Sequence, residues 1–330
     1  MRLDAASATF AAWLSNPEIP ELPHKLAVGW SGGADSTALL LALKASGHDV
    51  QAWHVDHGWR ESSHQESKKL AQQAKTWGVP FCSVRLSFSP QANREAEARK
   101  GRFEQFLSWS RSSGITTLCL AHNRDDQAET VCMRLLQGAG VGGCRGMQSE
   151  RIYQGLRIVR PLLHVSGVAL REALSAADVL WFEDPSNRDT TIWRNRIRHE
   201  LFPRMADAGV DPQQLFNRWQ QQAQRLARDL EAGADIVLAN SSSNSDGLMG
   251  LPWADWARAS VPIRARVLQR MMASTLGEGV TPGRRHIVLV EQWTARGGRG
   301  GLDLSGCRLQ RRQGRLHLQP RASVCASALA

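Results

Sequence analysis

The sequence lacks several patterns that would assign it to a common class. None of its six cysteines forms a Cys-x-x-Cys pair and no zinc-ligand spacing occurs, which favours reduced thiols in a cytoplasm. No apolar run approaches the ~18–20 residues of a membrane-spanning helix. The N-terminus shows neither a basic start nor an uninterrupted apolar stretch, so no signal peptide is expected. We therefore expect a cytoplasmic protein with no membrane partner.

Two common nucleotide-binding motifs, the Walker P-loop and the Gly-x-Gly-x-x-Gly fingerprint, are also missing. Instead, residues 31–36 spell Ser-Gly-Gly-Ala-Asp-Ser between the apolar runs 26–30 and 37–43. This layout predicts a strand, a tight turn and a helix. Glycines allow close backbone approach, and the free N–H groups at a helix start bind phosphate. The pattern indicates a site for a phosphate chain with magnesium, although an ordinary N-capped turn would share part of it.

The net charge of +10 is spread unevenly, because the residues from 201 onward contain 17 arginines and no lysine. A basic second half suits a polyanion such as RNA. A genome that prefers arginine explains the missing lysine but not the excess charge. The candidate RNA contacts in this half are Arg284, Arg285, Arg308, Arg311, Arg312 and Arg315.

Strand-like and helix-like segments alternate over the first ~140 residues, which predicts an α/β fold with a doubly wound parallel sheet. The expected strands are 25–30, 50–55, 79–88 and 115–121, and the expected helices are 36–45, 63–77, 94–112 and 125–136. We place a domain boundary between 205 and 206. The second domain, 206–330, is expected to be mostly helical, with a β-hairpin over 302–318.

Polar blocks follow the expected strands at their carboxyl ends, where such folds bind ligands. His54, Asp56 and His57 would lie beside an adenosine. Asp126 and Glu129 share a helix face, and with Asp35 they would hold Mg²⁺. The alternative is that acids in a first helical turn simply favour the helix dipole.

Arginine pairs occur on two further expected helices. Arg99 and Arg102 share one face, and Arg194 and Arg198 share another. The first pair is placed to clamp a phosphate or an anionic substrate, and the second to contact the polyphosphate or an RNA backbone. The alternative for both is a solvated surface helix.

Taken in order, these blocks resemble those of the tRNA(Ile)-lysidine synthases, a branch of the N-type ATP pyrophosphatases (the PP-loop superfamily, adenine nucleotide alpha hydrolase-like). The resemblance covers about 25–203 and continues more weakly to about 319. The motifs that carry it are the loop 31–36, His-Val-Asp-His-Gly-Trp-Arg at 54–60, Glu-Ala-Glu-Ala-Arg at 95–99, Asp-Asp-Gln-Ala-Glu-Thr at 125–130, Arg-Pro-Leu-Leu at 160–163, Glu-Asp-Pro-Ser-Asn at 183–187 and Arg-Asn-Arg-Ile-Arg at 194–198.

The resemblance implies that 1–205 is the catalytic domain and that 206–330 binds tRNA or substrate. It also implies the chemistry: ATP adenylates the C2 oxygen of the wobble cytidine in a tRNA(Ile) with a CAU anticodon, and the amine of free L-lysine then attacks C2 and expels AMP to form lysidine. The implied cofactors are ATP and Mg²⁺. The ATP-binding residues would be Ser31, Gly32, Gly33, Ala34, Asp35, Ser36, His54, Asp56 and His57. The catalytic residues would be Asp35, Arg102, Asp126, Glu129 and Arg194, with Asp35 and Asp126 holding the metal.

Three residues depart from the family pattern without removing a carboxylate or a phosphate donor: Trp59, Asn123 and Cys144. A tRNA-thiolation enzyme and a non-catalytic RNA-binding protein remain alternatives. The missing Cys-x-x-Cys pair counts against the first, and the intact carboxylates count against the second. The sequence leaves open monomer or homodimer, the lysine pocket, the general base, and the tRNA features read beyond the anticodon. It is expected to end before the further C-terminal domain of the long family members.

Overall fold

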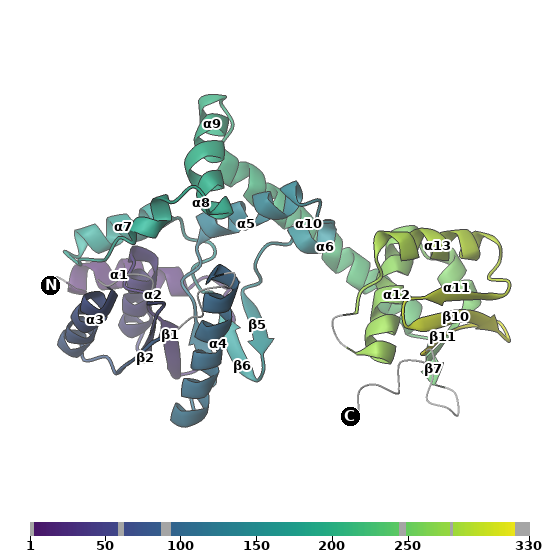
Figure 1. Cartoon of the computed structure of the whole chain (residues 1–330), viewed down its shortest axis with the longest axis horizontal. Coiled ribbons are helices and arrows are strands. Elements are labelled where there is room, and N and C mark those ends of the chain that lie inside the picture. The colour runs from purple at the N-terminus through teal and green to yellow at the C-terminus, as the bar shows by residue number, and fades with distance from the viewer. Residues whose placement is uncertain (1–2, 59–62, 87–93, 244–248, 278–279, 321–330) are drawn as a thin grey trace. The chain divides into compact units, whose positions relative to one another are not determined.

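The computed structural model describes residues 3–58, 63–86, 94–243, 249–277 and 280–320. The chain forms two compact units, Met1–Gln222 and Ala223–Ala330 (Figure 1). None of the described helices is long and apolar enough to cross a membrane.

The first unit contains a six-stranded sheet in the order β3-β2-β1-β4-β6-β5. All neighbouring strands are parallel except β5 and β6, which pair antiparallel. Its strands are β1 (Lys25–Gly29), β2 (Asp49–Asp56), β3 (Phe81–Arg85), β4 (Thr117–Cys119), β5 (Glu150–Tyr153) and β6 (Leu156–Val159). Its helices are α1 (Leu3–Leu14), α2 (Ala34–Ala45), α3 (Ser63–Trp77), α4 (Arg94–Ser113), α5 (Arg124–Leu136), α6 (Val141–Cys144), α7 (Gly167–Ala176), α8 (Trp193–Arg196) and α9 (Phe202–Asp207). Two short segments complete the unit: the 3-10 turn η1 (Pro185–Arg188) and the π-helical turn η2 (Ile197–Leu201).

Strand β1 lies at the centre of the sheet because both of its faces are apolar. Leu26 and Val28 pack into one core with residues of α1, α2, α3 and α7. Ala27 points to the opposite face of the sheet. It packs into a second core with Trp53 of β2 and Phe106 of α4. Helices therefore cover both faces of the sheet (Figure 1), and the doubly wound α/β class predicted from the sequence is confirmed.

The strand order reverses between β1 and β4, with β2 and β3 on one side and β6 and β5 on the other. Ligands bind at such a switch point, outside the carboxyl ends of the strands. The loop after β1 and the start of α5 after β4 both lie there. The antiparallel β5–β6 hairpin is a difference from the expected pattern. A tight turn at Gln154 (φ 48°) and Gly155 (φ 84°) joins its strands, and this geometry permits antiparallel pairing without a crossover helix.

The second unit combines helices with an antiparallel sheet in the order β7-β8-β11-β10-β9. Its elements are α11 (Trp253–Arg258), α12 (Val261–Leu276), α13 (Arg284–Ala295), β7 (Ser242–Ser243), β8 (Met249–Pro252), β9 (Gly301–Leu304), β10 (Cys307–Arg312) and β11 (Arg315–Pro320). The expected hairpin over 302–318 corresponds to β10 and β11, which turn at Gln313 and Gly314. Trp256, Met271 and Leu316 are among the buried side chains of its core.

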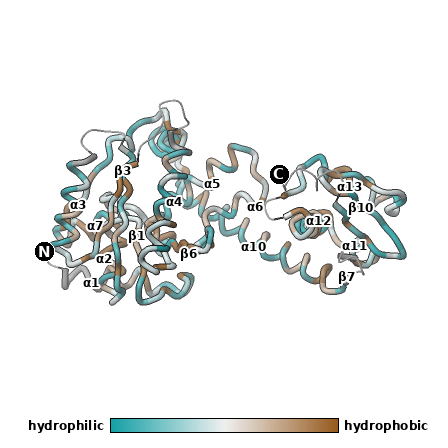
Figure 2. Tube along the Cα trace, turned by 60° about the horizontal axis from the view of Figure 1, so that its bottom comes forward, coloured by the Kyte–Doolittle hydropathy of each residue, from teal (hydrophilic) through white to brown (hydrophobic). Residues whose placement is uncertain are grey.

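A single long helix, α10 (Pro212–Leu238), runs from the first unit into the second. Buried residues recur along it at intervals of three, four and seven, at Gln220, Ala223, Ala227, Ala234 and Val237. Figure 2 shows the corresponding alternation of hydrophobic and hydrophilic residues. The division at Gln222 falls inside this helix, later than the boundary between 205 and 206 placed from the sequence. Both lie where the α/β alternation has ended.

Candidate active site

The loop 31–36 joins β1 to α2 through a backbone that requires glycine. Gly32 has φ +86°, and a Cβ added there would lie 2.8 Å from Leu70 Cδ2 and 2.9 Å from Phe182 Cδ2. Gly33 is the N-cap of α2, and no side chain caps the helix. The first amide groups of α2 therefore remain able to bind an anion at the positive end of the helix dipole.

Hydroxyl groups hold this loop in shape. The Oγ atoms of Ser31 and Ser36 lie 3.0 Å apart, and the Ser31 N–H donates to Ser36 Oγ over 3.2 Å. Ser36 Oγ also donates to the Gly33 carbonyl at 3.0 Å. Ser36 is buried, whereas Ser31 is exposed. In this structure Ser36 organises the loop, and Ser31 is the hydroxyl that a ligand can reach.

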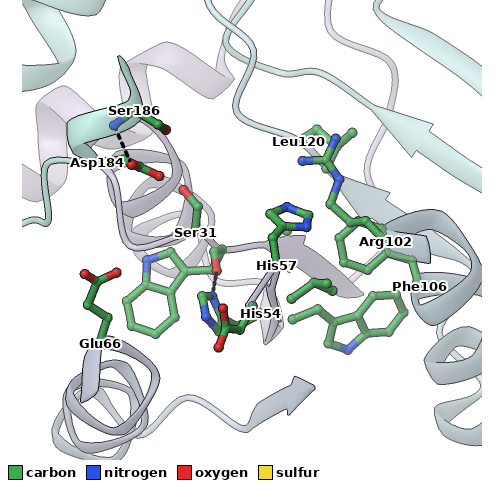
Figure 3. Close-up of a pocket in the computed structure, with 14 residues that line it drawn as sticks. Ser31, His54, His57, Glu66, Arg102, Phe106, Leu120, Asp184 and Ser186 are labelled. Carbon is green, nitrogen blue, oxygen red and sulfur yellow. Dashed lines mark hydrogen bonds between the residues drawn. The ribbon is translucent and has the colours of Figure 1, made fainter. Parts of the chain in front are cut away.

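A pocket opens beside the loop, at the ends of β1 and β2 (Figure 3). Figure 3 shows His57 between Ser31 and Arg102. Its lining residues are Gly29, Trp30, Ser31, Trp53, His54, Val55, Asp56, His57, Glu66, Arg102, Phe106, Leu120, Asp184 and Ser186. The structure thus brings together four of the predicted ATP-binding residues and the predicted catalytic Arg102.

Burial favours the neutral form of both histidines of the pocket. Burial, followed by the charge of Arg102, lowers the pKa of His57 to about 4. Burial also lowers the pKa of His54, whose Nδ1 lies 2.9 Å from the Trp30 carbonyl oxygen. Neutral imidazoles beside indole rings suit an uncharged heterocycle such as a nucleobase. The Asp56 side chain accepts the Gly58 N–H at 2.7 Å and lies 3.7 Å from Arg85, so it also stabilises the turn after β2.

The predicted carboxylates gather on the other side of the loop. Asp35 lies in the first turn of α2, and Asp126 lies in the first turn of α5. Burial, followed by the negative charge of Asp126, raises the pKa of Asp35 to about 6. Asn123 caps α5 by accepting the Asp126 N–H at 3.0 Å, and Asp126 accepts the Asn123 N–H at 3.1 Å. The residue that departs from the family pattern therefore fixes a carboxylate in place.

Glu129 is the most buried acid of the site, with its side chain 2% exposed. Arg198 donates to both of its oxygens, at 2.6 Å and 2.9 Å, and contacts Asp126 at 3.3 Å. Arg194 lies 3.7 Å from Glu129 and donates to Thr130 at 2.9 Å. Burial raises the pKa of Glu129, and the hydrogen bond from Arg198 opposes this rise.

The ion pair between Arg198 and Glu129 was not predicted from the sequence. The spacing of Arg194 and Arg198 placed both on one face, but no pattern in the sequence shows that this face meets Glu129. The π-helical turn η2 carries Arg198, and such turns are often found at functional sites.

The residues present fit a magnesium ion shared with phosphate. Asp35 Oδ1 is buried and has no hydrogen-bond partner among the described residues, and the Asp126 carboxylate is close enough to raise the Asp35 pKa. The described residues contain no group of three or more metal-ligating side chains. Mg²⁺ is commonly held by one or two carboxylates together with substrate phosphates and water, so the two aspartates suffice.

The six predicted RNA-contact arginines all lie in the second unit, so the structure does not place them among the residues above. Three of them have contacts within that unit. Arg308 pairs with Asp303 at 3.3 Å, Arg311 lies 4.7 Å from the Trp253 ring centroid, and Arg315 donates to the Gly250 carbonyl at 2.8 Å. The other three, Arg284, Arg285 and Arg312, are exposed.

Comparison with known proteins agrees with this geometry. A family model described as a PP-loop domain matches residues 6–205. The tRNA(Ile)-lysidine synthase of Ruegeria pomeroyi is 35% identical over 292 residues, which cover 86% of this chain and 68% of that protein. The chain belongs to the tRNA(Ile)-lysidine synthase family of PP-loop proteins. The resemblance inferred from the motifs is confirmed.

Other relatives match a smaller part of the chain. The tRNA(Ile)-lysidine synthase of Chlamydia felis is 38% identical over 175 residues, covering 52% of this chain and 55% of that protein. The chain thus matches about half the length of this relative. Among solved structures, the U34-tRNA thiolase NcsA of Methanococcus maripaludis superposes with a TM-score of 0.54 at 15% identity, covering 68% of this chain and 79% of that one. This likeness supports the PP-loop fold alone.

Proposed function

We propose that this protein converts the wobble cytidine of a CAU-anticodon tRNA(Ile) to lysidine. The C2 oxygen of the base attacks the α-phosphorus of ATP and pyrophosphate leaves. An amine of free L-lysine then attacks C2, loses a proton, and expels AMP together with the original oxygen. Adenylation is needed because a ring carbonyl oxygen is a poor leaving group. Membership of the family supports this proposal.

One structural observation carries the proposal. The phosphate loop 31–36 connects a pocket suited to a nucleobase with a buried carboxylate oxygen, Asp35 Oδ1, that no described residue contacts by a hydrogen bond. An ATP molecule with its adenosine in the pocket would extend its phosphates along the loop, towards Asp35 and Asp126. Mg²⁺ held there would offset the charge that develops on the departing pyrophosphate.

Residues of the chain take distinct roles in this scheme. The amides of Gly32 and Gly33, with the Ser31 hydroxyl, bind phosphate oxygens. His57 and Arg102 border the adenosine. Glu129 would attract the cationic lysine after exchange of its contact with Arg198.

The direct test is mass spectrometry of the wobble nucleoside. Purified protein is incubated with ATP, L-lysine and tRNA(Ile) bearing a CAU anticodon, and a mass increase corresponding to lysidine is expected. Omission of lysine, of ATP, or replacement of the tRNA by an elongator tRNA(Met) should each prevent it. An unmodified cytidine in the complete reaction would refute the proposal, whereas a thiolated base would favour the alternative activity.

A further inference from the structure

Four arginines and a histidine converge next to the pocket at the edge between α4, β5 and β6. We name as the basic cluster the side chains of Arg99, Arg102, Arg151, Arg160 and His122. The guanidinium carbons of Arg99, Arg102 and Arg151 lie 5.8, 5.9 and 5.4 Å from the ring centroid of buried Phe103. One aromatic ring thus orders three arginines from two elements.

Within the described part of the chain, acids do not balance the charges of the basic cluster. Among the described residues, none of its four arginines has a carboxylate within ion-pair distance. Burial, followed by the charges of Arg151 and Arg99, lowers the pKa of Arg160 to about 10. The neighbouring Arg157 of β6 differs, since it pairs with both oxygens of Glu150 at 2.9 Å.

Side-chain nitrogen atoms of the basic cluster also lack hydrogen-bond partners among the described residues. The Nε atoms of Arg102, Arg151 and Arg160 and the Nδ1 atom of His122 are buried without a hydrogen bond in the structure. Arg160 is 6% exposed and uses one Nη to reach the Gln148 carbonyl at 2.8 Å. Buried polar atoms are rarely left unsatisfied, and those that are require an explanation. A bound anion supplies one.

The shape of the basic cluster indicates which anion. It extends from exposed Arg99 to buried Arg160, and Arg102 also lines the pocket. A single arginine is enough to bind one carboxylate. Four arginines match the charge of several phosphates in a chain, and the oxygens of each phosphate fit the hydrogen-bond geometry of a guanidinium group. A ligand that runs from the protein surface to the nucleotide pocket and carries a charge at every repeat is a nucleic-acid backbone.

We propose that the basic cluster binds backbone phosphates of the RNA substrate next to the nucleotide that is presented to ATP. This rests on the proposed function, because it requires that RNA enters this pocket. The stacking on Phe103 holds the guanidinium groups in place before RNA arrives, so less side-chain entropy is lost on binding.

The test compares two double variants of the full chain. Arg99→Gln with Arg151→Gln removes two charges from the basic cluster at side chains that are not fully buried. Lys25→Gln with Arg111→Gln removes two charges from exposed side chains at the start of β1 and in the last turn of α4, at the amino edge of the sheet. For each, the tRNA dissociation constant is measured across a salt series, with ATP affinity and the KM for lysine measured in parallel.

We expect the cluster variant to bind tRNA roughly tenfold more weakly than the control. Its plot of log affinity against log salt should flatten by about 1 for each arginine removed. ATP affinity and the KM for lysine should stay at the control values. Equal tRNA affinities and equal salt slopes in the two variants would overturn the proposal, as would a raised KM for lysine with unchanged tRNA binding. Failure of the wild-type protein to bind tRNA would instead refute the proposed function itself, before any variant is compared.

Discussion

The two units of the chain bury different kinds of side chain. Among the described residues, every buried polar or charged side chain lies in the first unit, as with His54, Glu129, Arg160 and Asn195. The core of the second unit is formed by apolar side chains, and its arginines lie at its surface or are only partly buried. Burial of an ion costs several kcal/mol unless partners compensate. The first unit bears this cost near the carboxyl edge of its sheet, whereas the charged groups of the second unit, such as Arg264 and Glu291, are only partly buried.

This contrast indicates that the two units have different roles: the first contains the groups suited to a reaction, and the second displays a charged surface. Polar groups buried around the loop 31–36 have fixed positions and altered pKa values, which a reaction site needs. An apolar core stabilises a surface without constraining which charges that surface displays. Substitutions in the first unit should therefore alter catalysis and stability in opposite directions at some positions, and those in the second should not.

The largest effect is expected from Asp35→Asn. Loss of the carboxylate should lower lysidine formation by about 10²–10³-fold and abolish the effect of Mg²⁺ on ATP affinity. The same change should stabilise the fold, because burial raises the Asp35 pKa to about 6. The folded state binds this proton more tightly than the unfolded state, so the ionised form costs roughly 2–3 kcal/mol at pH 7.5.

Thermal melting and lysine incorporation measured on the same preparation check this prediction. The control is Asp207→Asn, which changes an exposed acid of the same unit. A variant that is inactive but melts at a lower temperature than wild type would indicate a structural role for Asp35 instead.

A smaller effect is expected from Arg198→Gln, which leaves Glu129 with the more distant Arg194. Breaking a fully buried pair costs roughly 3–5 kcal/mol, and we expect about 2 kcal/mol here because Arg198 is 37% exposed. Adding Glu129→Gln should recover much of the stability and none of the activity. Denaturant unfolding and lysine incorporation of the two variants distinguish these contributions.

The comparison between units supplies the control for that experiment. Arg264 pairs with Glu291 in the second unit, and their side chains are 12% and 22% exposed. Arg264→Gln should destabilise the protein comparably, yet the folded protein should still form lysidine. If Arg198→Gln and Arg264→Gln lost activity equally at a temperature where both are folded, the proposal that only the first unit contains the reaction site would be contradicted.

The sequence predicted the first unit well because its signals are local. Apolar runs such as 26–30 marked buried parallel strands, and the loop 31–36 lies where its glycines and hydroxyls indicated. The gathering of Asp35 and Asp126 followed from the rule that strand ends share an edge. These inferences need only the order of elements along the chain.

The rest depended on packing that no local pattern encodes. Arg198 meets Glu129 across 69 positions of sequence, and Arg151 lies on a hairpin strand that the alternation of helices and strands did not predict. The five-stranded sheet of the second unit includes β7 and β8, which are short and far in sequence from β11. Pairings of this kind are set by long-range contacts.

The exposed arginines of the second unit should have a still smaller effect. Changing Arg284, Arg285 and Arg312 together to Gln should leave the free energy of unfolding within about 0.5 kcal/mol of wild type. If these residues bind phosphate, tRNA affinity should fall several-fold, and the salt slope should fall by about 1 per residue. Binding titrations over a salt series measure both. An unchanged slope would remove these three residues from the RNA-binding surface and leave it within the first unit.

A difference in pH dependence is also expected between the cores of the two units. Burial, followed by the charge of Arg160, lowers the pKa of His122 to about 3, against ~6.5 in an unfolded chain. Between these values the unfolded state binds more protons, so the stabilisation is complete above pH 6.5 and is lost as the pH falls towards 3. At pH 5.5 the loss from this residue should be about 1 kcal/mol.

Native-state hydrogen exchange measures this loss of stability separately for the core of each unit. Amides of α2 should lose protection between pH 7.5 and pH 5.5, after correction for intrinsic exchange rates, while amides of α12 should change less. His122→Asn should flatten the pH dependence in α2, since an amide does not titrate in this range. Parallel loss of protection in both helices would mean that the units unfold together, and the cost of the buried polar groups would then be shared by the whole chain instead of being confined to the unit that contains them.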